Sequence, residues 1–245
     1  MGKQKRTRID KLLFERSCVD SRERAQRLIL AGQVLVDERV IDKPGRLVSW
    51  DAVIRIVGEE KYVSRGGYKL EAALDFFGID VKDLVCLDVG ASTGGFTDCL
   101  LQRGARKVIA VDVGHNQLAW KIRSDPRVAV YEGLNARALA PSIIGTTVRL
   151  AVADVSFISL RLILASIFSC VEDEGALIAL IKPQFELEPH KIGRGGIVRD
   201  EQLRQDAVLR IRRFATEELG REWVGVINSP IAGAKGNREF LACVR

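Results

Sequence analysis

From residue 85 onward, short apolar runs alternate with stretches in which apolar residues recur every three or four positions. Continuous apolar runs bounded by turn residues are typical of buried parallel strands, and the longer period is typical of helices that cover them. The pattern predicts strands at 85–89, 107–112, 128–132, 150–155, 176–182, 223–228 and 240–244, with helices at 94–103, 160–171 and 201–219. We therefore predict an α/β fold with a doubly wound, mostly parallel sheet whose last strand is antiparallel.

The first sixty residues follow another pattern. Apolar positions at helical spacing predict one helix at 8–16 and a second at 21–31. Asp20, with Glu23 three residues later, predicts the N-cap of the second helix. Short β-rich pieces follow at 34–37, 40–41 and 53–57. These features predict a small α+β module that is distinct from the sheet domain.

Charge supports the same division. Residues 1–65 carry 15 lysines and arginines against 10 acidic residues, whereas residues 66–245 carry 23 against 22. A basic excess confined to one end indicates a polyanionic partner, most often nucleic acid, although basic faces can also be merely solvated. We predict two domains, a module at 1–60 and a larger domain at 61–245.

The sequence argues against several classes of protein. The longest apolar runs fall far short of the roughly 20 residues that span a bilayer, and the basic N-terminus lacks the apolar stretch of a secretory signal. Five cysteines without paired spacing argue against a disulfide framework or a zinc site. His115 and His190 have no companion ligands. We therefore expect a cytoplasmic protein that has no membrane association and no metal site.

A glycine-rich turn follows the strand at 85–89 and enters a helix. Such a turn permits close backbone approach to a ligand, but its spacing is not GxGxxG, which weakens a dinucleotide interpretation. It resembles the D-x-G-x-x-x-G-G-[FW] loop of methyltransferases that bind S-adenosylmethionine, particularly the FtsJ-like group. The candidate cofactor residues in this loop are Asp88, Gly90, Ser92, Gly94, Gly95 and Phe96.

The next two predicted strands end with further candidates for the same ligand. Asp112 ends the strand at 107–112, the position of a doubly wound sheet that faces ribose hydroxyls. Glu132 is the last residue of the third strand and Asn135 follows it, where an adenine ring would lie. Together with the glycine turn, they favour a nucleoside-containing cofactor.

Four charged residues form the candidate catalytic set. Asp154 and Lys182 end the fourth and fifth predicted strands, and the carboxyl ends of parallel strands gather at one crevice. Lys69 follows the phrase SRGGY, and Glu239 precedes the last strand. Opposite charges at the ends of neighbouring apolar strands are costly unless they are paired or functional.

The whole pattern of the first module resembles the alpha-L RNA-binding module of ribosomal small-subunit protein four and of pseudouridine synthases. The phrases SRERAQRLILAGQVLVD and VIDKPGRLV carry the resemblance, from about residue 7 to 57. In that family the second helix and the following loop meet RNA backbone. The resemblance thus implies RNA contacts by Arg22, Arg24, Arg27 and Gln33.

The larger domain, with this module before it, resembles the TlyA family. VSRGGYKL, DVGASTGGFTDCLL, ADVSFISL and LIKPQFE occur in order, and the resemblance covers nearly the whole chain. It implies a Rossmann-like methyltransferase domain that uses S-adenosylmethionine to methylate ribose 2′-hydroxyls of ribosomal RNA in ribosomal subunits. It also implies that Lys69, Asp154, Lys182 and Glu239 form the catalytic tetrad of FtsJ-like enzymes.

Alternatives stay open at this point. Lys182 acts as a base only if its amine is neutral. Burial and the nearby Lys69 favour the neutral amine, whereas Asp154 and Glu239 favour the charged one. A charged Lys182 would instead stabilise the oxyanion. Some TlyA relatives carry the label haemolysin, so a membrane-lytic protein is one alternative, and a non-catalytic ribosome-binding factor is another. The sequence does not specify the nucleotide, the ribosomal subunit or the oligomeric state.

Overall fold

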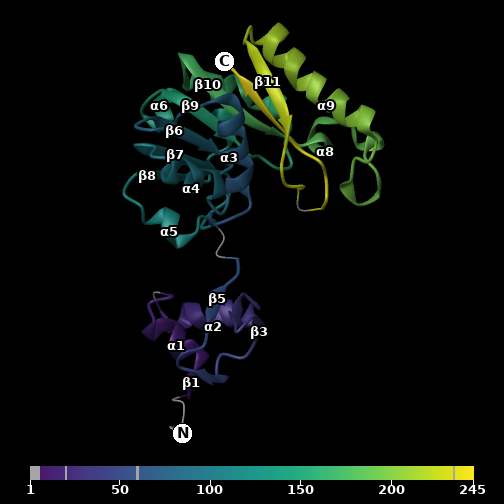
Figure 1. Cartoon of the computed structure of the whole chain (residues 1–245). Coiled ribbons are helices and arrows are strands. Elements are labelled where there is room, and N and C mark those ends of the chain that lie inside the picture. The colour runs from purple at the N-terminus through teal and green to yellow at the C-terminus, as the bar shows by residue number, and fades with distance from the viewer. Residues whose placement is uncertain (1–5, 20, 59–60, 234) are drawn as a thin grey trace. The chain divides into compact units, whose positions relative to one another are not determined.

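The computed structural model describes residues 6–19, 21–58, 61–233 and 235–245. The chain divides into two compact units, Met1–Glu60 and Lys61–Arg245 (Figure 1). Within the described residues, no helix has the length and apolar character needed to cross a membrane.

The described residues of the smaller unit form two helices and five three-residue strands. Its elements are β1 (Arg6–Arg8), α1 (Ile9–Glu15), α2 (Arg22–Leu30), β2 (Val34–Val36), β3 (Arg39–Ile41), β4 (Leu47–Ser49) and β5 (Ile54–Ile56). β3, β2 and β5 form an antiparallel sheet in that order, and β1 pairs with β4. Apolar residues of α1 and α2, among them Leu12, Leu13 and Ile29, are fully buried between these pieces.

Both helices and the three β-rich pieces were predicted, and two details differ. The N-cap of α2 is Ser21, whose Oγ accepts a hydrogen bond from the backbone N–H of Arg24 at 3.1 Å. The predicted N-cap, Asp20, is therefore wrong by one position, and Asp20 itself lies outside the described residues. The short strands β1 and β4 were not predicted, because three residues give too little periodicity. Asp37 and Glu38 both have positive φ, as a tight hairpin turn between β2 and β3 requires.

The larger unit is built around one seven-stranded sheet in the order β11-β12-β10-β9-β6-β7-β8. The strands are β6 (Val85–Val89), β7 (Lys107–Asp112), β8 (Val128–Glu132), β9 (Val148–Ala153), β10 (Val171–Ile181), β11 (Trp223–Asn228) and β12 (Phe240–Val244). β12 runs antiparallel to both of its neighbours, and the other pairs are parallel. The predicted doubly wound, mostly parallel sheet with an antiparallel last strand is confirmed.

Helices cover both faces of this sheet (Figure 1). They are α3 (Gly66–Phe77), α4 (Gly95–Gln102), α5 (Trp120–Arg123), α6 (Pro141–Ile144), α7 (Leu164–Ser169), α8 (Pro183–Glu186) and α9 (Glu201–Arg213). α9 continues as a short π-helix over Phe214–Glu218. Short 3₁₀ turns occur at Ala136–Ala138, Leu160–Leu162, Pro189–Lys191 and Arg194–Gly196. α3 and α4 pack in one core and α7 and α9 in another, and successive residues of β6 point alternately into the two cores.

The boundaries of two site-bearing strands differ from the prediction. β9 begins and ends two residues earlier than predicted, so Asp154 follows the strand instead of lying within it. β10 begins at Val171, five residues early, and its pairing with β9 shifts register between Val171 and Ala176. The first part of β10 contains charged residues, so a prediction that relies on apolar runs places the start of this strand too late.

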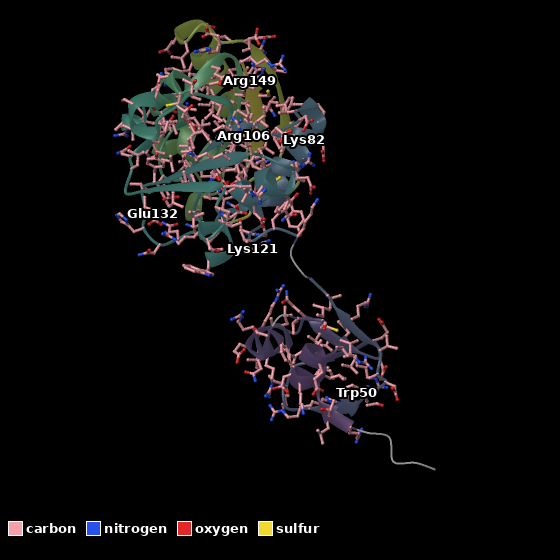
Figure 2. The ribbon with its side chains drawn as sticks, turned by 90° about the vertical axis from the view of Figure 1, so that its left-hand side faces the viewer. Trp50, Lys82, Arg106, Lys121, Glu132 and Arg149 are labelled. Carbon is pink, nitrogen blue, oxygen red and sulfur yellow. The ribbon has the colours of Figure 1, made fainter. Side chains whose placement is uncertain are left out.

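Strand direction brings the candidate residues to one edge of the sheet. Arg106 directly precedes β7 and Arg149 lies near the start of β9, whereas Glu132 ends β8; Figure 2 labels all three on the larger unit. Because β12 is antiparallel, it starts where β10 ends, and Phe240 pairs with Ile181. Glu239 and Lys182, the residues just outside this pair, therefore reach the same edge.

Candidate active site

The turn between β6 and α4 forms a concave backbone surface. Gly90 has φ +84°, and a Cβ placed there would lie 2.6 Å from the carbonyl oxygen of Asp154. A Cβ on Gly95 would collide with Ser64 Oγ. Only glycine allows these close approaches, so the turn can lie against the connection after β9 and still leave space above it. Gly94, with φ +95°, is the N-cap of α4.

A cavity of about 460 Å³ opens above this turn, and we name it the first cavity. All four predicted catalytic residues line it, although they come from separate parts of the chain. Its other lining residues are Ser64, Arg65, Gly66, Gly90, Ala91, Ser92, Thr93, Gly95 and Phe96. The structure thus brings the glycine turn and the tetrad together around one space, as the sequence predicts.

The tetrad is divided into two amine–carboxylate pairs. Lys69 Nζ, from α3, donates to Glu239 Oε2 at 2.6 Å, and both side chains are nearly buried. Lys182 Nζ lies 2.6 Å from Asp154 Oδ1 and donates to Ser156 Oγ at 2.9 Å. Each amine therefore has its own carboxylate. Burying a charged amine next to a carboxylate costs less than burying either group alone, because the net charge of each pair is close to zero.

A second cavity of about 430 Å³ adjoins the first and shares Gly90, Ser92 and Asp154 with it. Asp112 and Asn135, two of the predicted cofactor residues, line it. The two oxygens of Asp112 accept from the backbone N–H groups of Ser92 and Gly114, both at 2.7 Å. Each carboxylate oxygen keeps capacity for a further donor.

Glu132 does not line either cavity. Its carboxylate accepts from the backbone N–H of Asn116 at 2.7 Å and pairs with Arg123 of α5. It therefore holds the segment between β7 and α5. The Asn135 side chain is also engaged, because its Oδ1 accepts from the backbone N–H of Arg137 at 3.0 Å.

Asp88 is fully buried beneath the glycine turn and does not line the cavities. Its Oδ2 accepts from Thr97 Oγ1 at 2.6 Å, whereas its Oδ1 has no hydrogen-bond partner among the described residues. Burial raises the pKa of Asp88 to about 7. Asp88 thus ties the strand end to the first turn of α4 from below.

This buried carboxyl gives a testable pH dependence. The folded protein keeps a proton on Asp88 up to about pH 7, whereas the unfolded chain loses it near pH 4. The stabilisation that the Asp88 proton gives the folded protein is therefore fully present below about pH 4, and it is lost as the pH rises towards 7. Relative to Asp88→Asn, the free energy of unfolding of the wild type should fall by roughly 2–4 kcal/mol between pH 4 and 8. Denaturant titrations at several pH values measure this difference.

The matched control is Asp173→Asn, at an exposed aspartate of β10. Its unfolding free energy should follow that of the wild type at every pH. A constant difference between wild type and Asp88→Asn across the range would contradict the assigned role of burial.

A third cavity, of about 340 Å³, shares Lys182 and Glu239 with the first cavity and Ser156 and Phe157 with the second. Phe157 is 90% exposed and has φ +64°, an unfavourable backbone conformation for a bulky residue. Its ring lies 5.2 Å from that of Phe185. Sequence reasoning did not select these residues, although the phrases ADVSF and KPQFE contain them.

The predicted RNA contacts all belong to the smaller unit. Arg27 is exposed, whereas Arg24 is partly buried. Arg22 donates to the buried carboxylate of Asp10 at 3.1 Å, and about half of its side chain stays accessible. Gln33 Nε2 donates to the backbone carbonyl of Gly58 at 3.1 Å. α2 and the following loop thus present basic and amide groups from a folded surface.

Comparison with known proteins defines the class. Residues 62–245 match the FtsJ-like methyltransferases, and residues 7–54 match the S4 domain. The chain belongs to the FtsJ-like methyltransferase family, in its TlyA branch with an N-terminal S4 domain.

Individual relatives cover nearly the whole chain. It is 46% identical over 243 residues to the 16S/23S rRNA (cytidine-2′-O)-methyltransferase TlyA of Mycobacterium tuberculosis, covering 98% of this chain and 90% of the relative. It is 44% identical over 241 residues to Hemolysin A of Brachyspira hyodysenteriae, covering 96% and 98%. A haemolysin-labelled structure from Streptococcus thermophilus superposes with a TM-score of 0.75 at 42% identity, covering 98% of this chain and 88% of that one.

Proposed function

We propose that this protein transfers a methyl group from S-adenosylmethionine to a ribose 2′-hydroxyl of ribosomal RNA. The observation that supports this most strongly is the pair of amine–carboxylate contacts on the wall of the first cavity, directly above the glycine turn. The activity for which the M. tuberculosis relative is named supplies the substrate class. Cytidine is therefore the expected target nucleoside.

The first and second cavities fit a nucleoside-containing methyl donor. Asp112 is placed to accept hydrogen bonds from ribose hydroxyls, and Asn135 lies in the same cavity, where a base would be held. The backbone at Gly90 and Ser92, common to both cavities, would hold the part of the donor between its two ends. When bound, S-adenosylmethionine supplies an electrophilic methyl group on a positively charged sulfur.

The task of the chain is then to align a ribose hydroxyl and take up its proton. Lys182 Nζ lines the first and third cavities, held by Asp154 and Ser156. To act as a base, Lys182 must first release its own proton from the ion pair with Asp154. We assign the neutral amine as the group that then accepts the hydroxyl proton, while the oxygen forms its bond to the methyl carbon and that carbon leaves the sulfur. The resulting ammonium is stabilised by Asp154. Lys69 and Glu239 balance each other's charge and line the same cavity.

The third cavity is the proposed entrance of the target nucleoside. It shares Lys182 and Glu239 with the first cavity, so a ribose placed between them reaches the catalytic amine. Phe157 and Phe185 offer aromatic surface there, and stacking on an exposed ring is a common way to hold an unstacked RNA base.

The S4 domain is proposed to bind RNA backbone through its basic helix. Replacing exposed Arg27 with glutamate should weaken binding to ribosomal RNA and reduce its salt dependence, with a slope of log affinity against log salt that is smaller by about 1. Filter binding at several salt concentrations measures this. Arg106→Glu, at an exposed arginine directly before β7 in the larger unit, is the control and should keep the wild-type affinity and salt slope (Figure 2).

Methyl transfer from tritiated S-adenosylmethionine to separated, unmethylated ribosomal subunits tests the proposed function. We expect label in ribosomal RNA and, after digestion, in a 2′-O-methylated nucleoside. Label on a base or on protein, or no label on any RNA, would reject the proposal. Leakage from liposomes in a parallel assay would instead favour the lytic activity that the haemolysin label of some relatives suggests.

A further inference from the structure

Glu186 is a buried acidic residue at the end of α8, four positions after Lys182. Only 6% of it is exposed. Its Oε2 accepts a hydrogen bond from Ser159 Oγ at 2.5 Å, and its Oε1 accepts one from the backbone N–H of Leu160 at 2.9 Å. Both partners lie beyond the end of β9, in the segment that begins at Asp154. One carboxylate therefore joins the connections that follow two neighbouring strands.

These connections carry the reactive side chains but lie outside the sheet. The pairing of β9 with β10 ends at Ala153 and Ala179, before Asp154 and Lys182 are reached. Each residue is held by another strand, because the Asp154 N–H donates to the carbonyl oxygen of Val89 at 3.0 Å and Ile181 pairs with Phe240. Contacts between the two loops add the constraint that joins Asp154 and Lys182 to each other. Phe157 against Phe185 is one such contact, and the two hydrogen bonds to Glu186 are another.

The surroundings fix the carboxylate firmly. Arg210 NH1, from α9, donates to the backbone carbonyl oxygen of Glu186 at 2.6 Å, which anchors the end of α8 to the long helix. Burial raises the pKa of Glu186, although the hydrogen bonds from Leu160 and Ser159 act in the opposite direction. A buried acid is costly, and an apolar residue would fill the same space without that cost. The hydrogen bonds across the two loops give the carboxyl group a role that an apolar residue could not perform.

We propose that Glu186 is a positioning residue that holds the Asp154 segment against the Lys182 segment and so sets the contact between Lys182 Nζ and Asp154. The proposal rests on the proposed function for its kinetic consequence. Its structural consequence does not depend on that function, because the environment of Lys182 can be measured without any substrate.

The first measurement is labelling of lysine amines with an acylating reagent in the full-length protein, followed by peptide mass spectrometry. Lys182 and Lys69 are matched probes, with side chains 11% and 10% exposed. In Glu186→Ala, Lys182 should react several-fold faster while Lys69 keeps its wild-type rate. Faster labelling of both lysines would indicate general loosening and overturn the proposal, as would unchanged labelling of Lys182.

The second measurement is single-turnover methyl transfer. Glu186→Ala should lower the rate by about 10- to 100-fold, because small misplacements of reacting groups are costly, while the affinity for S-adenosylmethionine stays unchanged. Glu186→Gln should restore both readouts, because its amide oxygen can accept from Leu160 and its NH₂ group can donate to Ser159 Oγ. Glu217→Ala, at an exposed glutamate, is the truncation control.

A Gln variant as impaired as the Ala variant would overturn the proposal. If Glu186→Ala does not fold, Ser159→Ala is tested instead. It removes one of the two hydrogen bonds to Glu186 and should raise the labelling of Lys182 but not that of Lys69. A wild-type protein that is inactive on RNA would reject the proposed function, and the labelling result would still test the role of Glu186.

Discussion

Replacing Lys182 with alanine should reduce the rate of methyl transfer by roughly 10²- to 10⁴-fold, the usual contribution of a positioned proton acceptor. The amine lies 2.6 Å from Asp154 Oδ1 at the wall shared by the first and third cavities, so its loss removes the acceptor but leaves the glycine turn intact. Affinity for S-adenosylmethionine should change little. Single-turnover transfer to ribosomal subunits and calorimetric titration with the donor measure the two quantities.

Lys182→Arg sharpens this prediction. A guanidinium keeps the positive charge and hydrogen-bond donors but does not give up its proton at accessible pH. If Lys182 accepts the proton, the arginine variant should be as inactive as the alanine variant. Substantial activity of Lys182→Arg would contradict this role and favour a charged stabiliser. Lys82→Ala, at an exposed lysine before β6, is the matched control and should be fully active (Figure 2).

The largest expected effect on stability concerns the ion pair between Lys69 and Glu239. Replacing Lys69 with methionine leaves the Glu239 carboxylate, itself only 3% exposed, without its cation. Removing one partner of a buried ion pair typically costs about 3–5 kcal/mol, so the free energy of unfolding should fall by that amount. Urea titration followed by circular dichroism measures the loss.

The double variant Lys69→Met with Glu239→Gln separates stability from catalysis. Without a buried charge to leave uncompensated, it should recover most of the lost stability and should still transfer methyl groups poorly. A double variant no more stable than Lys69→Met alone would show that the ion pair is not the cause. A fully active double variant would remove Lys69 and Glu239 from the proposed catalytic set.

Much of the fold could be predicted because local sequence and tertiary structure agree. β6, β7, β8, β11 and β12 occupy the predicted ranges, since each is a continuous or alternating apolar run bounded by turn residues. The predictions were weaker where local signals were short or mixed. α3, which carries Lys69, was not predicted as a helix; it begins with two glycines, and such residues are unfavourable in helices.

The sequence by itself determined which chemical groups are present and that strand ends would gather Asp154 and Lys182 near the glycine turn. Only the tertiary structure decided the partners: Lys69 with Glu239, and Lys182 with Asp154. It also placed Asp88 beneath the turn and Glu132 against Arg123. The reason is physical, because hydrophobic periodicity specifies which face of an element is buried, whereas the pairing of charges depends on strand order and on loop contacts between residues far apart in the chain.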